Sequence, residues 1–246
     1  MERAAGRAPP VGALFDVGYC LMDESVRLSR ALAWVSAALG ASGRSITPAR
    51  LDQAYREACR RPAPGEPSLL VRLLGDLGLE PREARAIRQA LPWDVEPLTL
   101  YPDTLVSLRT LRQAGFLVGV LANQPASAQV DLDRAGVTAL CNGVWLSGAV
   151  GLAKPAPAFF ALALDAWGLP PGRVAYVGDR PDNDVAPAKA LGMATLRVRT
   201  GPHAEQTPRG EGERPGMEAA SLTEAVRHLL AWQAALVARS LTKPPE

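Results

Sequence analysis

The stretch Val11-Gly-Ala-Leu-Phe-Asp-Val-Gly-Tyr-Cys-Leu-Met-Asp23 decides how the rest of this chain is interpreted. A short apolar run ends abruptly at Asp16, and a glycine follows two residues later, which is typical of a buried strand that ends in a turn. Open α/β sheets bind their ligands at the carboxyl ends of parallel strands, where Asp16 would lie. Taken alone, the stretch fits a functional carboxylate and an ordinary loop aspartate equally well.

Size and charge set the outer limits of the interpretation. The chain has 246 residues, of which 48% are hydrophobic, so it is long enough for one large domain or for one domain with a smaller insertion. Its 27 basic and 25 acidic residues give a formal charge of +2, and the basic residues form no clustered stripe. This balance argues against a nucleic-acid partner.

The cysteines and the apolar segments favour a cytoplasmic protein. Cys20, Cys59 and Cys141 are odd in number and far apart, so neither a disulfide framework nor a zinc site is indicated. Residues 1–10 lack the apolar core of a signal peptide, and no run of 18 apolar residues predicts a membrane span. We expect a monomer or a homodimer that does not bind membranes.

Residues 24–97 form a long segment with helical patterning and no strand signal. Apolar residues recur from Ser25 at mixed spacings of three and four, and Thr47-Pro48 is a typical helix start. A loop at Arg61–Pro67 precedes two further helical stretches, Ser68–Leu77 and Pro81–Leu91. We therefore interpret residues 24–97 as a helical domain inserted after the first strand.

Beyond Tyr101 the pattern alternates regularly between strands and helices. The strands are expected at 116–121, 144–146, 174–177 and 194–198, and the helices at 104–114, 126–135, 156–167, 184–191 and 221–237. Such alternation predicts an α/β fold with a doubly wound, Rossmann-like parallel sheet. Residues 11–23 and 98–240 would together form this core, with residues 201–216 as a mobile loop that carries His203 at the surface.

Suggestive residues follow four of the predicted strands. They are Asp16, then Ala122-Asn123, then Lys154-Pro155, and finally Gly178-Asp-Arg-Pro-Asp-Asn-Asp184. Because the carboxyl ends of parallel strands share one edge of a doubly wound sheet, these residues should converge.

The acidic residues among them suit a hard divalent cation. Asp179 and Asp184, close to a third carboxylate, form an oxygen cluster of the kind that binds Mg²⁺. Lys154 can offset part of the negative charge, and lysine is rare in this chain. Asp182 or Asn183 is expected to cap the following helix.

Taken together, these motifs resemble the haloacid dehalogenase-like hydrolase superfamily, and the resemblance covers nearly the whole chain. Residues 11–23 resemble its first motif with Asp16 at the nucleophile position, and Leu121-Ala-Asn123 resembles the second. Lys154-Pro155 and Gly178 to Asp184 resemble the third and fourth. The insertion at residues 24–97 falls where the family carries a helical cap of the first type.

The resemblance implies a Mg²⁺-dependent phosphatase that forms an aspartyl-phosphate on Asp16 and acts on a small phosphorylated metabolite. The metal would be held by Asp16, Asp179 and the backbone carbonyl of Gly18, with Asp184 acting through water. Lys154 would neutralise the nucleophile and the phosphoryl group.

The phosphate-contact positions of the second and third motifs correspond to Ala122, Asn123 and Lys154.

Departures from the family pattern leave two alternatives open. The family's phosphatases usually carry a second aspartate as general acid where this chain has Gly18, and a Ser or Thr where it has Ala122. Loss of the acid predicts slow hydrolysis of alkyl phosphates, since acid catalysis contributes about 10²–10⁴ in rate. One alternative is a 2-haloacid dehalogenase, which needs no metal. The other is a catalytically weakened relative that binds a phosphorylated ligand or a protein partner. Retention of Asp179 and Asp184 favours the metal-dependent reaction.

Overall fold

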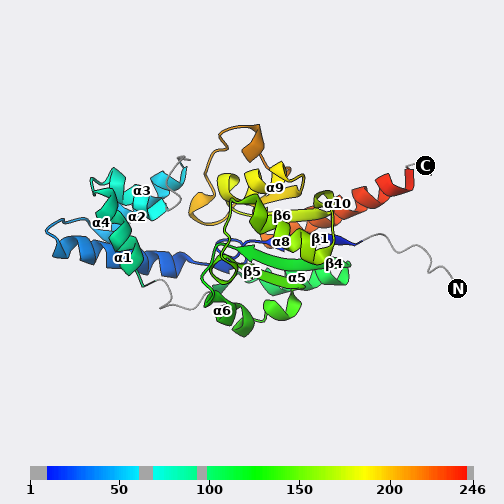
Figure 1. Ribbon diagram of the computed structural model, residues 1–246, viewed down its shortest axis with the longest axis horizontal. Coiled ribbons are helices and arrows are strands. Elements are labelled where there is room, and N and C mark those ends of the chain that lie inside the picture. Colours follow the sequence, from blue (N-terminus) through cyan, green and yellow to red (C-terminus); the bar gives the residue numbers. More distant parts are fainter. Residues whose placement is uncertain (1–9, 61–68, 93–98, 243–246) are drawn as a thin grey trace.

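The computed structural model describes residues 10–60, 69–92 and 99–242, and the side chains among them as far as residue 239. Outside these ranges lies the predicted loop at Arg61–Pro67. Residue 98, where the core was predicted to resume, also lies outside them. Helices α1–α4, which lie between residues 25 and 90, gather at one end of the molecule, and the C-terminal helix α10 (Leu222–Thr242) extends toward the other (Figure 1).

The core is a parallel sheet of six strands in the order β5-β4-β1-β6-β7-β8. The strands span Val11–Phe15 (β1), Phe116–Ala122 (β4), Gly143–Leu146 (β5), Val174–Gly178 (β6), Ala194–Val198 (β7) and Met217–Ala219 (β8). The first strand pairs with β4 on one side and β6 on the other. All five of its residues are buried, which is why its sequence is continuously apolar.

Helices cover both faces of the sheet, as the α/β prediction requires. One face packs against α5 (Thr104–Gln113), α6 (Ala128–Arg134) and α10 (Leu222–Thr242). The other packs against α8 (Pro157–Trp167) and α9 (Ala186–Ala190). The predicted doubly wound, Rossmann-like fold is therefore confirmed.

Four helices lie in the part of the predicted insertion that the structure describes. They are α1 (Ser25–Ala41), α2 (Pro48–Arg60), α3 (Leu69–Asp76) and α4 (Pro81–Ala90), and they share a hydrophobic cluster of their own. Thr47 Oγ1 accepts a hydrogen bond from Arg50 N at the start of α2, as expected of an N-cap. Two short antiparallel strands, β2 (Met22–Asp23) and β3 (Thr99–Leu100), pair where the chain leaves and re-enters the core.

Several short elements were not predicted. The strand β8 and the 3₁₀ turns η4 (Gly201–His203) and η5 (Glu211–Glu213) lie in or beside the polar segment 201–216. The turns η1 (Thr138–Leu140) and η2 (Pro171–Arg173) and the short helix α7 (Ser147–Val150) are further additions. The expectation that His203 lies at the surface is wrong, because burial against α2 leaves its side chain only 6% exposed.

Candidate active site

Asp16 directly follows the central strand β1, and the backbone of both neighbouring strands fixes its place. Its backbone N–H donates to Val177 O at 2.9 Å, so the residue continues the pairing with β6. Its side chain is nearly buried, and Oδ1 accepts a hydrogen bond from Val17 N at 2.8 Å. The carboxylate is therefore held in one orientation at the carboxyl edge of the sheet.

Lys154 reaches this carboxylate from the loop before α8, and its backbone is clamped by Asn123. Lys154 N donates to Asn123 Oδ1 at 2.7 Å, and Asn123 Nδ2 donates to Lys154 O at 2.9 Å. Both ends of the Asn123 amide thus hold the lysine loop. Whether Asn123, or the buried Ala122 before it, contacts a phosphate stays a prediction.

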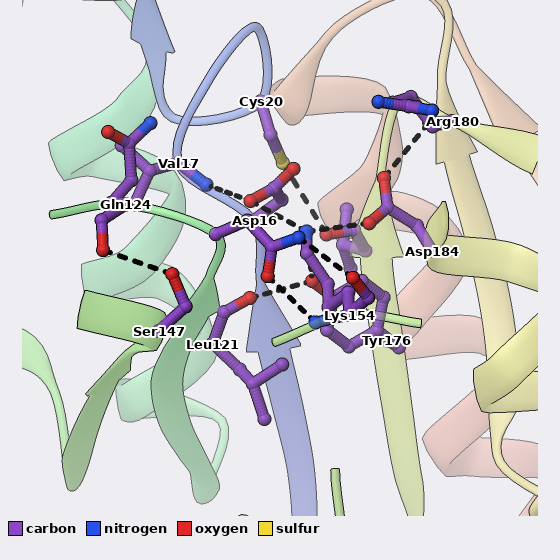
Figure 2. A network of polar contacts seen from close by, with 12 residues as sticks. Asp16, Val17, Cys20, Leu121, Gln124, Ser147, Lys154, Tyr176, Arg180 and Asp184 are labelled. Carbon is purple, nitrogen blue, oxygen red and sulfur yellow. Dashed lines mark hydrogen bonds and ion pairs between the residues drawn. The ribbon is translucent and has the colours of Figure 1, made fainter. Parts of the chain in front are cut away.

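The ammonium group of Lys154 lies between two carboxylates (Figure 2). Its Nζ is 2.9 Å from Asp16 Oδ1 and 2.7 Å from Asp184 Oδ1, and it donates to the Tyr176 hydroxyl at 3.0 Å. Burial alone would lower the pKa of Lys154, but the two carboxylates outweigh burial and raise it. Lys154 is therefore a fixed positive charge at neutral pH.

Three carboxylates gather around this single ammonium group. Oxygens of Asp16, Asp179 and Asp184 lie within 4.8 Å of one another, and all three residues are buried. Burial, reinforced by the other two carboxylates, raises the pKa of Asp179 well above its ordinary value. Burial also raises the pKa of Asp16, although Lys154 opposes that shift. The excess of buried negative charge suits a divalent cation with oxygen ligands.

A π-helical turn, η3 (Pro181–Val185), returns Asp184 to the end of strand β6. Asp184 Oδ2 accepts a hydrogen bond from Arg180 N at 3.0 Å. A Cβ atom at Gly178 would lie 2.4 Å from Asp184 Oδ2, so glycine is needed for this close approach. The expected capping by Asp182 or Asn183 is wrong: no side chain caps this turn, and Asp182 pairs instead with Arg180 at 2.9 Å.

The turn after Asp16 contains Gly18, and Tyr19 and Cys20 follow it. Tyr19 has a left-handed φ of 52°, its ring packs against Gly201, and Thr200 Oγ1 donates to its carbonyl. Cys20 is buried, and its thiol donates to Val177 O at 3.6 Å. The Tyr19 ring therefore packs against Gly201, and the Cys20 thiol is bonded to the backbone of Val177. Neither side chain takes the place of the aspartate side chain that is missing at Gly18.

That place is occupied by the carboxyl group of Glu24. A Cβ atom at Gly18 would lie 2.9 Å from Glu24 Cδ, and Gln124 Nε2 donates to Glu24 Oε1 at 2.8 Å. Burial raises the pKa of Glu24; the hydrogen bond from Gln124 opposes this shift and the Asp16 carboxylate adds to it.

Three residues of this site, Glu24, Gln124 and Tyr176, were not predicted from their sequence patterns. Glu24 is the first residue of the predicted insertion, and Tyr176 lies within the predicted strand at 174–177. Gln124 follows the second motif directly, and that proximity was the available signal.

A sequence model of the haloacid dehalogenase-like hydrolases matches residues 13–192, a range that runs from β1 past the acidic cluster. The chain belongs to this family. The predicted superfamily is thereby confirmed.

Similar proteins of this family include both phosphatases and dehalogenases. The chain is 35% identical over 119 residues to the glyceraldehyde 3-phosphate phosphatase of Methanopyrus kandleri, covering 48% of this chain and 51% of that protein. It spans about half the length of the curated relatives it matches.

Two solved structures extend the likeness to most of the chain. A phosphatase from Thermococcus onnurineus is 25% identical with a TM-score of 0.57, over 89% of this chain and 97% of that one. A 2-haloacid dehalogenase from Pseudomonas syringae is 20% identical with a TM-score of 0.58, over 91% and 100%, and shows a shared fold.

Proposed function

We propose that this chain is a Mg²⁺-dependent phosphatase that hydrolyses a small phosphorylated metabolite through an aspartyl-phosphate on Asp16. The observation that carries the proposal is the buried cluster of Asp16, Asp179 and Asp184 around the single ammonium of Lys154. Such a concentration of negative charge is costly unless a cation or a ligand compensates it. The name of the Methanopyrus kandleri relative supports a small phosphorylated substrate.

The residues present fit a magnesium ion. Asp16, Asp179 and the backbone carbonyl of Gly18 would hold it, with Asp184 acting through water, and all of these ligands are hard oxygens. When bound, the ion supplies charge neutralisation for the phosphoryl group.

The reaction begins with attack of an Asp16 carboxylate oxygen on phosphorus. Lys154 lies 2.9 Å from Asp16 Oδ1, so its charge holds the nucleophile in place and offsets the charge of the phosphoryl group. Asn123 keeps the lysine loop in register with the end of β4. Water then hydrolyses the aspartyl-phosphate and restores the carboxylate.

We also propose that residues 24–97 are a cap domain and that residues 11–23 and 98–240 form the catalytic core. The separate hydrophobic cluster of α1–α4 and the β2–β3 pair at their base support this division. A cavity of about 370 Å³ lies between the turn at Tyr19 and helices α1 and α2, with Asp52 and Arg56 in its wall. Substrate choice would then depend on the inserted helices.

The decisive experiment measures turnover of aryl, acyl and alkyl phosphates with Mg²⁺ and with a chelator. We expect Mg²⁺-dependent turnover of aryl and acyl phosphates, and its loss by at least about 10³-fold in Asp16→Asn, since covalent catalysis is removed. Absence of turnover on every ester, with Asp16→Asn matching the wild type, would contradict the proposal.

The alternatives predict different results in the same assay. A dehalogenase would release halide from 2-haloacids in the presence of the chelator. A binding protein would be stabilised by a phosphorylated ligand without turning it over.

A further inference from the structure

The carboxyl group of Glu24 lies beside the nucleophile loop and has no role in the chemistry described above. It stands at the start of α1, where its backbone carbonyl accepts from Leu28 N at 2.8 Å, but its side chain makes no capping hydrogen bond. Asp23 performs that task by accepting a hydrogen bond from Ser25 N at 2.8 Å. The Glu24 side chain instead turns back toward Gly18, two residues after Asp16.

Gln124 fixes this orientation through its hydrogen bond to Glu24 Oε1. The Gln124 carbonyl in turn accepts hydrogen bonds from Gly148 N at 3.0 Å and Ser147 Oγ at 3.2 Å, so the residue that holds Glu24 is itself anchored. In Figure 2 Gln124 lies on the Val17 side of Asp16, across from Lys154 and Asp184. The residue that holds Glu24 therefore lies on the side of the nucleophile away from the charged cluster.

A phosphate ester attacked by Asp16 releases an oxygen that carries a full negative charge unless a proton reaches it. Three other proton-bearing groups near Asp16 are already engaged. Lys154 is paired with two carboxylates, the Cys20 thiol donates to Val177 O, and the Tyr176 hydroxyl donates to Leu121 O. The Glu24 carboxyl group, by contrast, accepts a hydrogen bond from the neutral amide of Gln124.

We propose that Glu24 is a catalytic residue whose carboxyl group contacts the leaving-group oxygen and transfers a proton to it. This inference rests on the proposed phosphatase reaction and deepens it. The space that Gly18 leaves free is what admits the Glu24 carboxyl group to the loop of the nucleophile. A cavity of about 370 Å³ has Tyr19 and Ser25, the chain neighbours of Gly18 and Glu24, in its wall.

The step balances as follows in atoms and charge. The Asp16 Oδ–P bond forms while the bond from phosphorus to the ester oxygen breaks, and its electron pair stays on that oxygen. The oxygen takes the proton of Glu24, which becomes a carboxylate, and the alcohol leaves. When water attacks the aspartyl-phosphate, its proton passes to the Glu24 carboxylate as the Asp16–phosphorus bond breaks.

The test compares an alkyl ester, glycerol 2-phosphate, with an aryl ester, p-nitrophenyl phosphate, in the full chain with Mg²⁺. A nitrophenolate leaves readily without a proton, whereas an alkoxide does not. We expect Glu24→Ala and Glu24→Gln to lower kcat/KM for the alkyl ester by about 10²-fold or more and for the aryl ester by less than about tenfold. Asp23→Asn, the neighbouring acid, is the matched control and should leave the ratio of the two esters unchanged.

The double variant Gly18→Asp with Glu24→Ala tests whether activity can be recovered, because removing the Glu24 side chain clears the space that an aspartate side chain at position 18 would need. Its kcat/KM for the alkyl ester should be at least about tenfold higher than that of Glu24→Ala. Equal losses on both esters, or a Glu24→Gln variant with the wild-type ratio, would overturn the role of Glu24 alone. A wild type that hydrolyses neither ester would overturn the proposed phosphatase and this inference together.

Discussion

Asn123 shows how a single side chain can position another without touching the reacting atoms. Its amide makes two hydrogen bonds to the backbone of Lys154, at 2.7 and 2.9 Å, and so ties the lysine loop to the end of β4. A residue of this kind acts through the one it holds. Its removal should therefore affect both stability and turnover.

We predict that Asn123→Ala loses about 1–3 kcal/mol of unfolding free energy, the net value of two hydrogen bonds, and lowers kcat because Lys154 is no longer fixed. Urea denaturation and steady-state kinetics with an aryl phosphate measure the two effects. The matched control is Asn142→Ala, whose Oδ1 accepts from Val118 N at 3.0 Å outside the site and which should lose stability without losing kcat. Wild-type kcat in Asn123→Ala would exclude the positioning role.

The residues of the site were predictable to the extent that the sheet topology places them. Asp16, Lys154, Asp179 and Asp184 follow predicted strands, and parallel strands present their carboxyl ends at one edge, so convergence required no knowledge of side-chain conformation. Glu24 joins the site through the direction of its side chain at a helix start, and no spacing rule specifies that direction. Its part in the site could therefore be found only from the structure.

At the scale of elements, the turn η4 joins the core to helix α2. His203 of this turn lies 3.8 Å from Cys59 Sγ through Nε2, and its Nδ1 lies 3.1 Å from Gln206 Oε1. Burial, together with the positive charge of Arg180, lowers the pKa of His203 to about 3. The folded protein therefore holds this imidazole neutral, whereas the unfolded chain protonates it near 6.5.

The unfolded chain then binds more protons than the folded protein between pH 6.5 and about 3, so protonation of His203 destabilises the fold as the pH falls through this window. We predict that His203 costs about 2 kcal/mol of unfolding free energy between pH 7.5 and pH 5. Urea denaturation at both pH values should show this loss in the wild type and its absence in His203→Gln. The control, His228→Gln, changes a half-buried histidine on α10. Equal pH dependence in all three proteins would contradict the prediction.

Elements were predictable where their sequence patterns are long. The longer strands of the core are continuous apolar runs, and the longer helices of both faces carry apolar residues at helical spacing. By contrast β2 and β3 have two residues each and β8 has three, too few for a period to register. The π-helical turn at Pro181–Val185 was missed for a different reason: its shape depends on Asp184 folding back to Gly178 and Lys154, which are distant contacts.

At the scale of the whole molecule, the fold supports a group of charges that opposes its own stability. The sheet brings three buried carboxylates together against one ammonium group. Sites of this kind are maintained for function at a cost that the rest of the core offsets. The packed core around the sheet supplies this compensation. None of the described helices is both long and apolar enough to cross a membrane.

Replacement of one carboxylate should therefore raise stability in the absence of metal and reduce the stabilisation that the metal provides. In a chelator, Asp179→Asn should raise the melting temperature above that of the wild type. The substitution removes a carboxylate that is buried beside two other acids, which together raise its pKa well above the usual range. With Mg²⁺ at about 100 times its dissociation constant, the wild type should gain about 2.7 kcal/mol, or roughly 5–10 °C. The variant should gain less than half of that.

Differential scanning calorimetry in chelator and in Mg²⁺ measures both effects on the same samples. Asp165→Asn removes an exposed acid on α8, away from the sheet edge, and serves as the control that should follow the wild type in both conditions. An Asp179→Asn protein that is less stable than the wild type in chelator would show that the cluster is compensated within the protein. An unchanged response to Mg²⁺ would show that Asp179 is not a ligand, because a ligand's loss must weaken the binding on which the stabilisation depends.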